Sequence, residues 1–338
     1  MKILITGGGG FIGSRLARFL LERGRLDDRA IDRLVLADQV SPRAELTSDA
    51  RVEARVGPLA SQCEGFGREG FDGVFHLASA VSGECEADFD LGLRSNLDTT
   101  RALLDGLRSS TLSGKAAAKL VFSSSVAVFG PDPSKPLPDL VGDETLPAPK
   151  TSYGTHKLMC EHLIADYSRK GFVDGRSARL MTVTVRPGRP NGAASSFFSG
   201  IIREPLAGVE AICPVAAEVS HPLTSAARTV EGLVAVYEAS IEALGGRLAL
   251  NLPAVNVTVA EMLEALEAVA GKAVRERVRF VRDETIAGIV ANWSRGATAA
   301  RATRLGLRAD PDFATIIRQY IADCREAPGG GTALRGLA

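Results

Sequence analysis

Short apolar runs alternate with longer amphipathic stretches over the first two thirds of the chain. The short runs have the length of buried strands, and the stretches between them repeat their apolar residues at a spacing close to 3.6, which is typical of helices. Strands that are buried on both faces and alternate with helices are typical of a parallel sheet covered on both sides. The pattern therefore predicts an α/β fold with a doubly wound parallel sheet. The expected strands are Ile3–Thr6, Arg33–Ala37, Gly73–Leu77, Lys119–Phe122 and Met181–Arg186, and the expected helices are Phe11–Arg23, Asn96–Leu107 and Tyr153–Lys170.

The pattern changes after residue 187. Residues 188–222 are rich in Gly, Pro, Ser and Ala, and they contain one short apolar stretch at Phe197–Ile202. We expect residues 1–187 to form a first domain, to which parts of the later chain return, and residues 188–326 to form mainly a smaller, interwoven α+β substrate cap. Residues 327–338 contain three consecutive glycines and are expected to form a flexible tail. Further helices are expected at Ala226–Leu244, Val259–Ala270 and Asp312–Arg325.

Composition excludes several classes of protein. The 338 residues include 40 basic and 40 acidic side chains without a dense basic run, so no nucleic-acid partner is expected. No apolar run approaches the ~18 residues of a membrane span, and the first strand begins too early for a signal-peptide core. The five cysteines show neither CxxC nor Cys/His spacing, so we expect free thiols and no metal site. These features favour a soluble cytoplasmic protein.

A glycine-rich turn joins the first strand to the first helix. Residues 6–13 have the sequence TGGGGFIG, which places Gly7, Gly10 and Gly13 at the three positions of a GxxGxxG motif. The first glycine permits a tight turn, the second lets backbone N–H groups reach a pyrophosphate, and the third lets the helix pack closely on the strand. A glycine run alone also fits a flexible loop, but the strand before it and the helix after it indicate a dinucleotide site of the Rossmann type. Phe11 and Ile12 at the start of the helix belong to this site.

Asp38 follows the second expected strand, 25 residues beyond Gly13. A carboxylate at this place accepts hydrogen bonds from the ribose hydroxyls and repels a 2′-phosphate. The spacing slightly exceeds the usual value of about 20 residues, and a longer loop after the first helix accounts for the excess. The alternative is an aspartate in a surface turn. The position favours NAD over NADP as the cofactor.

A tyrosine, a lysine and a set of serines supply the candidate chemistry. Tyr153 and Lys157 lie four residues apart on an expected helix and therefore share one face. Free tyrosine has a pKa of about 10, and a nearby ammonium favours its ionised form. Ser123, Ser124 and Ser125 follow an expected strand whose carboxyl end faces the ligand crevice. A hydroxyl there can hold a substrate oxygen while the tyrosine exchanges its proton. Each feature alone also fits an ordinary surface helix or strand end.

In order and spacing, these motifs resemble the extended short-chain dehydrogenase/reductase family, which includes sugar-nucleotide epimerases and dehydratases. The resemblance covers about residues 1–190 and includes the segment Val74-Phe75-His76-Leu77-Ala78. It implies that Ser125 binds substrate, that Tyr153 is the acid/base and that Lys157 binds the ribose. His76 is implied to be structural and not a metal ligand. The further cofactor-binding residues that it implies are Leu59, Ala78, Ser79, Asn96, Ser123 and Pro187.

The chain departs from the pattern of this family at three places. Pro58, in the segment Gly57-Pro58-Leu59, stands where the family usually has an acidic residue that meets the adenine amine. Sugar-nucleotide enzymes also carry an arginine for the diphosphate near the position of Ser220, and this chain lacks it. Where the family has an asparagine after the sixth strand, this chain has Arg189, whose guanidinium suits a substrate carboxylate. Ser82 and Asn191 are the other expected substrate contacts.

Further segments resemble the D-erythronate dehydrogenases, a group within this family that oxidises a four-carbon sugar acid. They include residues 167–176, 194–197, 202–206 and 251–253. This resemblance implies an NAD-dependent dehydrogenase that acts on the 2-hydroxyl of a small sugar acid. A nucleotide-sugar epimerase or dehydratase with tightly bound NAD and a non-enzymatic dinucleotide sensor are the alternatives. Many relatives dimerise through the helices expected at Asn96–Leu107 and Tyr153–Lys170, so we expect a homodimer.

Overall fold

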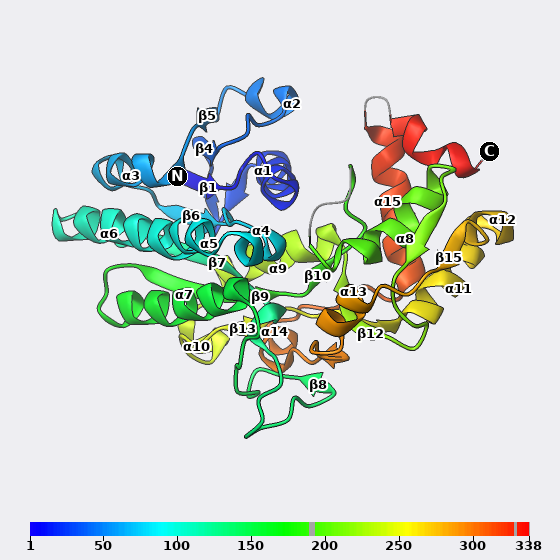
Figure 1. The fold of residues 1–338 in the computed structure, drawn as a ribbon. Coiled ribbons are helices and arrows are strands. Elements are labelled where there is room, and N and C mark those ends of the chain that lie inside the picture. Colours follow the sequence, from blue (N-terminus) through cyan, green and yellow to red (C-terminus); the bar gives the residue numbers. More distant parts are fainter. Residues whose placement is uncertain (189–192, 328–329, 338) are drawn as a thin grey trace.

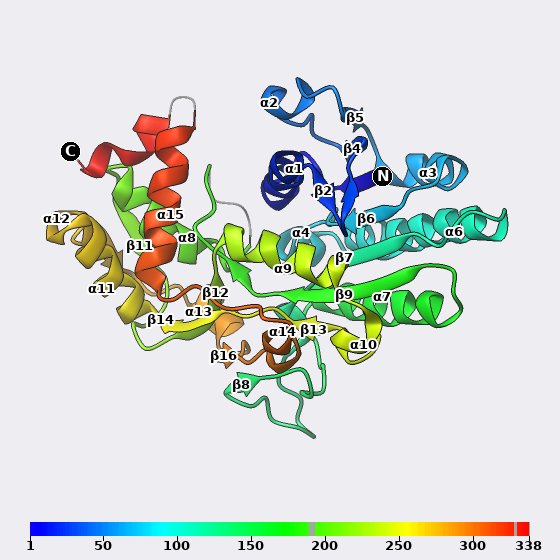
Figure 2. The same cartoon turned by 180° about the vertical axis from the view of Figure 1, so that it is seen from behind.

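A parallel sheet of seven strands forms the centre of the first domain, in the order β13-β9-β7-β6-β1-β4-β5. The structure is a computed structural model that describes residues 1–188, 193–327 and 330–337. Figures 1 and 2 show this sheet and its helices at one side of the molecule and the cap at the other. The predicted doubly wound sheet with a smaller cap is confirmed. The strands are β1 (Lys2–Thr6), β4 (Arg33–Asp38), β5 (Val52–Val56), β6 (Gly73–His76), β7 (Lys119–Ser125), β9 (Asp174–Leu180) and β13 (Leu250–Asn251).

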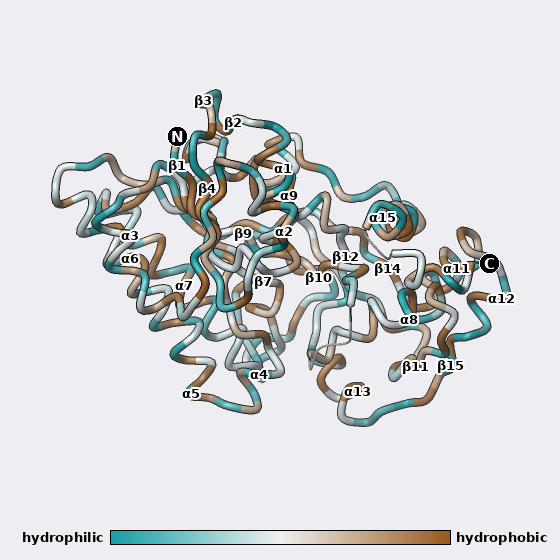
Figure 3. The backbone as a smooth tube through the Cα atoms, turned by 90° about the horizontal axis from the view of Figure 1, so that it is seen from above, coloured by the Kyte–Doolittle hydropathy of each residue, from teal (hydrophilic) through white to brown (hydrophobic). Residues whose placement is uncertain are grey.

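Neighbouring residues of β1 pack into opposite helix layers, and Figure 3 shows brown, hydrophobic stretches along the central strands. Ile3 and Ile5 of β1 pack in one core with residues of α1 (Phe11–Arg23) and α9 (Ala226–Glu238). Leu4, between them, packs in a second core with residues of α3 (Cys63–Glu69), α6 (Thr99–Leu112) and α7 (Ser152–Arg169). This two-sided burial explains why the strands appear in the sequence as unbroken apolar runs.

Three strands of the sheet, β5, β9 and the two-residue β13, differ from the sequence prediction. The edge strand β5 was not expected, because its sequence VEARV is half exposed and alternates polar and apolar residues. The sixth strand is β9 and not Met181–Arg186, of which only Thr182–Val183 is a strand (β10), outside the central sheet. Strand β9 contains Arg176 and Arg179, which are buried, and their charges hide its strand character. Arg176 donates to backbone carbonyls of α9 and of the turn after it, so the charge is satisfied inside the protein.

The cap has its own apolar core. Its helices α8 (Ser196–Leu206), α11 (Val259–Ala270) and α15 (Phe313–Glu326) surround this core. Residues Gly330–Leu337, inside the expected tail, form a 3-10 helix whose Ala333, Leu334 and Leu337 pack against it. The cap strands are β10, β12 (Ser220–Thr224) and β14 (Val255–Thr258) in one small sheet, and β11 (Ala211–Cys213) and β15 (Val278–Phe280) in another.

The later chain also returns to the first domain. Strand β13 pairs with β9, and α9 contacts α1, β7 and β9. Near this return, the buried Arg301 of α14 (Ala300–Arg304) donates to the carbonyls of Leu244, Leu248 and Ala249. The two domains are therefore interwoven.

The remaining short elements are β2 (Arg25–Leu26), β3 (Arg29–Ala30), α2 (Ala44–Thr47), α4 (Ser82–Ala87), α5 (Phe89–Gly92), β8 (Leu140–Val141), α10 (Ile241–Leu244), α12 (Lys272–Arg275), α13 (Glu284–Val290) and β16 (Gly296–Ala297).

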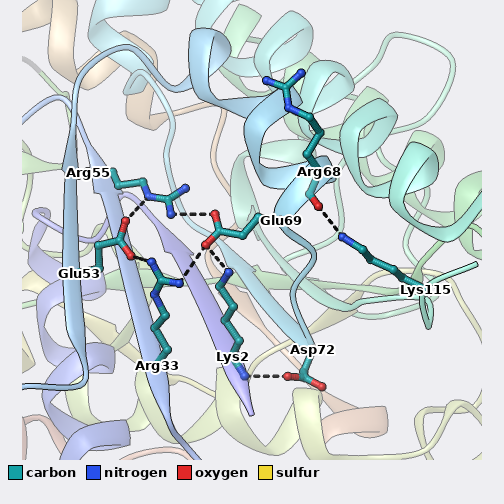
Figure 4. A network of polar contacts seen from close by, with 8 residues as sticks. All are labelled: Lys2, Arg33, Glu53, Arg55, Arg68, Glu69, Asp72 and Lys115. Atoms are coloured by element: carbon teal, nitrogen blue, oxygen red, sulfur yellow. Dashed lines mark hydrogen bonds and ion pairs between the residues drawn. The ribbon is translucent and has the colours of Figure 1, made fainter. Parts of the chain in front are cut away.

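Ion pairs link α3 to β1, β4 and β5, the three strands at one side of the sheet (Figure 4). Glu69, at the end of α3, pairs with Lys2 of β1, with Arg33 of β4 at 3.3 Å and with Arg55 of β5 at 2.7 Å. Glu53 of β5 joins the same group through Arg33 and Arg55. One carboxylate thus contacts side chains from three neighbouring strands.

Candidate active site

A cavity of about 1000 Å³ lies between the carboxyl ends of the central strands and the cap. Its lining comes from the loops after β1, β4, β6 and β7, from α7, and from residues of the cap such as Ser199, His221 and Trp293. In doubly wound folds, ligands bind at this edge of the sheet. The cavity is therefore the candidate active site.

The glycine loop has the geometry that a dinucleotide requires. Gly7 has a φ of 74°, and a Cβ there would lie 2.8 Å from the nitrogen of Ala78. A Cβ on Gly13 would lie 2.0 Å from the carbonyl oxygen of Gly7, so only glycine lets α1 approach the turn this closely. Phe11 and Ile12 begin α1 at the cavity, where the first N–H groups of a helix lack intrahelical partners and attract a phosphate. The loop fits a bound pyrophosphate.

Asp38 lies at the end of β4 and lines the cavity. Its carboxylate accepts hydrogen bonds from the N–H groups of Gly9 at 3.0 Å and Val40 at 3.1 Å. These bonds hold the carboxylate beside the glycine loop. Pro58 and Leu59 line the cavity next to it and offer no charged side chain.

Asn96 fixes the loop that follows β6. It is 3% exposed and lies in a π-helical turn, Leu93–Asp98, before α6. Its side-chain oxygen accepts from the N–H of Ala80 at 2.7 Å and from the hydroxyl of Ser79 at 3.1 Å. Ala78 and Ser79 line the cavity, while Asn96 supports them from behind and does not belong to the lining. The predicted contact between Asn96 and the cofactor stays a prediction.

His76 is a buried structural residue. Its ring nitrogens make hydrogen bonds to the hydroxyls of Thr6 at 2.7 Å and Thr100 at 2.9 Å. Burial, and to a lesser degree the positive charge of Lys157, lower the pKa of His76 to about 3. The ring is therefore neutral at physiological pH, and its two bonds tie β1 and β6 to α6.

Tyr153 and Lys157 both line the cavity from α7. This helix begins after Thr151, whose hydroxyl accepts from the N–H of Gly154 at 3.0 Å. Lys157 is 3% exposed, and its Nζ donates to the carbonyl of Ser123 at 2.7 Å. The same Nζ lies 5.5 Å from the centre of the Tyr153 ring. The ammonium therefore stands between the tyrosine and the end of β7.

Ser125 ends β7 at the same place. Its Oγ accepts from the N–H of Ala127 at 3.1 Å, which leaves its hydroxyl proton available as a donor. A Cβ on Gly154 would lie 2.1 Å from the carbonyl oxygen of Ala127, so this glycine lets α7 approach the turn after Ser125. Ser123 also lines the cavity, and its hydroxyl donates to the carbonyl of His76 at 3.2 Å. The structure thus brings the three predicted catalytic residues to one wall.

A buried ion pair supports this wall and was not predicted. Glu161 of α7 is 5% exposed and binds Arg179 of β9 through two hydrogen bonds, at 2.9 and 2.8 Å. It also accepts from Ser124 of β7 at 2.5 Å. Glu161 lies eight residues after Tyr153, on the same helix face. This spacing is the feature of the sequence that could have placed Glu161 near the site.

The cap wall carries further polar residues that sequence reasoning missed. His221 is buried and stacks on Phe198, with ring centres 5.2 Å apart. Its Nδ1 lies 3.3 Å from the carbonyl of Ser294, which only accepts, so Nε2 accepts from the hydroxyl of Thr182 at 2.8 Å. Burial lowers the pKa of His221 to about 4, so the ring stays neutral at physiological pH. The Thr182 hydroxyl, which lines the cavity, therefore keeps its lone pairs as acceptors.

The predicted substrate contacts have different outcomes. Ser82 lines the cavity at the start of α4, and Pro187, which was expected to contact the cofactor, lines it as an exposed residue. Arg189 and Asn191 lie outside the described residues, so their roles stay predictions. Across the described ranges, no group of three or more His, Cys, Asp or Glu could hold a metal ion. No helix in those ranges is long and apolar enough to cross a membrane.

A helix-borne Tyr/Lys pair beside a serine strand end, facing a glycine loop, defines a dinucleotide-dependent enzyme. The model of the NAD dependent epimerase/dehydratase family matches residues 3–242, and the chain belongs to that family. The predicted resemblance and NAD as the cofactor are confirmed, and the chain is an NAD-dependent oxidoreductase of the short-chain dehydrogenase/reductase type.

Two curated relatives are similar over nearly their whole length. The chain is 48% identical to a D-erythronate dehydrogenase from Cupriavidus necator, over 96% of this chain and 98% of the relative. It is 41% identical to a D-erythronate dehydrogenase from Haemophilus influenzae, over 95% and 99%. A crystal structure described as a nucleoside-diphosphate-sugar epimerase from Agrobacterium tumefaciens has a TM-score of 0.90 and 40% identity, and covers 96% of this chain and 94% of its own.

Proposed function

We propose that this enzyme oxidises the 2-hydroxyl group of a small sugar acid, such as D-erythronate, to the 2-oxo acid. The observation that carries the proposal is the similarity to two D-erythronate dehydrogenases over nearly the whole chain, cap included. The cap contributes much of the cavity wall, so similarity there bears on the substrate and not only on the cofactor.

The residues of the cavity have complementary roles in this reaction. Ser125 donates a hydrogen bond to the oxygen on C2, and Tyr153, acting as the base, removes the proton of that oxygen. As the proton leaves, the C2–O bond becomes double and the C2–H bond breaks with its electron pair. Bound NAD would supply the hydride acceptor for that electron pair. Lys157 binds the ribose, and its positive charge lies 5.5 Å from the centre of the Tyr153 ring.

The glycine loop and Asp38 hold the cofactor in this proposal. Gly7, Gly10 and Gly13 let the N-terminus of α1 approach the pyrophosphate, and Asp38 accepts from the ribose hydroxyls. Ala78, Ser79 and Leu59 line the remaining path. From the sequence, Arg189 and Asn191 stay candidates for the substrate side.

A nucleotide-sugar epimerase is the second candidate. The name of the similar Agrobacterium structure favours it. The segment around Ser220 disfavours it, because no arginine occupies this position and the Ser220 hydroxyl donates to the carbonyl of Arg295 at 2.7 Å. Two phosphate charges would therefore lack a usual partner.

One assay separates these functions. Purified protein is mixed with NAD and with D-erythronate, L-threonate, UDP-glucose or UDP-galactose in separate reactions. We expect free NADH to accumulate, at an absorbance of 340 nm, with a sugar acid alone. Interconversion of the two UDP-sugars without release of NADH would instead establish the epimerase, and binding of NAD without turnover of any of the four would favour the sensor.

A further inference from the structure

We propose that Arg186 binds the carboxylate of the substrate and so selects 2-hydroxy acids. The inference rests on the proposed function and adds a residue to it. Arg186 follows β10, lines the cavity from the cap side and is half-buried. Neither the pattern of the sequence nor the resemblance to the family gave it this role.

Hydrogen bonds fix both the backbone and the side chain of Arg186. Its N–H donates to the hydroxyl of Ser199 at 3.0 Å, and its carbonyl accepts from Arg203 at 2.8 Å. The side chain is fixed by a bond from Nε to the carbonyl of Val183 at 3.1 Å. This bond engages one edge of the guanidinium and leaves the two Nη atoms as donors. A planar pair of N–H donors fits a carboxylate.

The charge of Arg186 has no acidic partner among the described residues. Arg203, which also lines the cavity, differs in this respect because it pairs with Glu204 at 2.5 Å. Burial lowers the pKa of Arg186, and the only other contribution, from Tyr153, acts in the opposite direction. A half-buried cation without a counter-ion is costly. An anionic ligand would relieve this cost.

The position of Arg186 relative to Tyr153 indicates the class of acid. Both groups line the same cavity, Arg186 from the chain after β10 and Tyr153 from α7. In a 2-hydroxy acid the carboxylate is bonded directly to the carbon that is oxidised. The cation that binds the carboxylate on C1 and the base that acts on the C2 hydroxyl must therefore lie close to two adjacent carbons. In a nucleotide sugar, the diphosphate lies further from the reacting carbon.

The other cations that line the cavity fit this role less well. Lys157 already donates to the carbonyl of Ser123, and it belongs to the first domain, on the side of the glycine loop. Arg94 is exposed, so its guanidinium is hydrated and gains less from an anion. Arg186 therefore combines partial burial, a fixed side chain and a place in the lining of the cavity that Tyr153 also faces.

The test is a kinetic comparison with D-erythronate and its neutral amide. Arg186→Gln should raise KM for D-erythronate by about tenfold to a hundredfold, because a charge-assisted bidentate pair is lost. Arg186→Lys should recover only part of the loss, since it lacks the planar fork. KM for the amide should hardly change in Arg186→Gln, which a merely structural role of Arg186 would not explain. Arg279→Gln is the matched control, because this cap arginine pairs with Glu210 at the surface, and it should leave KM unchanged.

Three outcomes have distinct meanings. If Arg186→Gln keeps the KM of the unmodified enzyme for D-erythronate, the inference is overturned while the proposed function stands. If Arg189→Gln or Arg94→Gln raises KM and Arg186→Gln does not, the carboxylate is bound by that residue and the inference is likewise overturned. If the unmodified enzyme oxidises no sugar acid, the proposed function itself fails. Titration of the variants with NAD should give an unchanged Kd, which shows that the cavity is still formed.

Discussion

Lys157 is buried, and among the described residues its ammonium contacts a backbone carbonyl and aromatic rings and no carboxylate. An acidic partner would offset the effect of the positive charge on Tyr153. Without one, the positive charge acts on the tyrosine ring and on the end of β7, where the substrate oxygen is expected. The bond to the Ser123 carbonyl fixes the direction of the side chain.

We expect Tyr153→Phe to lower kcat by about a hundredfold or more, because it removes the group that takes the proton. NAD binding should persist, since the ring and Lys157 remain. Tyr167→Phe is the matched control on the same helix, because its hydroxyl contacts Asp105 away from the cavity. Steady-state NADH formation and a titration with NAD measure both effects. Full turnover by Tyr153→Phe would refute the assigned acid/base.

A second prediction at this scale concerns Asp38. NAD should be preferred over NADP, because the carboxylate of Asp38 would repel a 2′-phosphate at the edge of the cavity. Asp38→Gly combined with Gln39→Arg should reverse the preference, since it removes the negative charge and adds a cation next to it. The ratio of kcat/KM for the two cofactors measures this. Equal use of both by the unmodified enzyme would contradict the prediction.

Helix α7 is tied to two strands of the sheet by Glu161. The carboxylate of Glu161 binds Arg179 of β9 and Ser124 of β7, so the helix that carries Tyr153 cannot shift along the strand end that carries Ser125. Both members of the ion pair are nearly inaccessible, with 4% and 6% of their side chains exposed. Such a pair is costly to break, because one buried charge is left without a partner.

We expect Glu161→Gln to lower the free energy of unfolding by about 3–5 kcal/mol, because Arg179 would stay buried and charged. The double variant Glu161→Met with Arg179→Met should regain much of this loss, since no charge is left behind. Urea unfolding at pH 7 measures the three proteins. Asp166→Asn on the same helix breaks an exposed ion pair with Arg169 and should have almost no effect. A cost for Glu161→Gln as small as that of Asp166→Asn would contradict the prediction.

Glu69 gives a pH-dependent prediction. Burial alone would raise the pKa of its carboxyl, but hydrogen bonds and charges from Lys2 and Arg55 hold the pKa below its ordinary value. A pKa that is lower in the folded state stabilises the fold above the unfolded value of about 4.3, and the gain is lost as the pH falls through the folded value. Glu69→Gln should therefore cost about 1 kcal/mol at pH 7 and low salt, and much less at pH 3.

Urea unfolding of the two proteins at both pH values checks this prediction. Glu64→Gln is the control, because Glu64 pairs with Arg68 at a strongly exposed site, and its variant should match the unmodified protein at either pH. A cost of Glu69→Gln that does not change with pH would mean that the amide disturbs packing and not charge.

The sequence predicted α1 and α11 to the residue, because both are amphipathic and each ends at a glycine. It did not reveal β9, since Arg176 and Arg179 in that strand are buried by partners that come from distant parts of the chain. For the same reason the sequence did not reveal Glu161 and His221 in the site, because elements from distant parts of the chain bury them. The glycine loop and the Tyr/Lys pair were predictable, because their function depends on local spacing.

At the scale of the molecule, large apolar side chains stay exposed near α7. Phe89 of α5 is 61% exposed and Met159 of α7 is 45% exposed, and Phe89 lies beside His156 of the same helix, with ring centres 6.3 Å apart. Exposed apolar groups that cluster favour an interface, whereas single ones are common at any surface. The predicted homodimer through α6 and α7 would cover them.

We expect the protein to sediment as a dimer and Met159→Arg to shift it towards the monomer, because a charge would be buried at the interface. Val209→Arg is the control, since Val209 is an exposed apolar residue of the cap, at 55% against 45% for Met159. Analytical ultracentrifugation at several concentrations measures the state. A monomeric unmodified protein would exclude the dimer, and an unaffected dimer in Met159→Arg would move the interface elsewhere.

The return of α9 to the first domain has a consequence for synthesis. Tyr237 of α9 stacks on Phe75 of β6 with ring centres 5.3 Å apart, and β13 adds the last strand beside β9. On the ribosome, the nascent chain exposes the cofactor loop early, but α1 alone covers only part of this face of the sheet until residues 226–251 have emerged. Domains often fold in the order of their synthesis. This enzyme cannot, because the segment that closes its first domain is translated after the chain has already entered the cap.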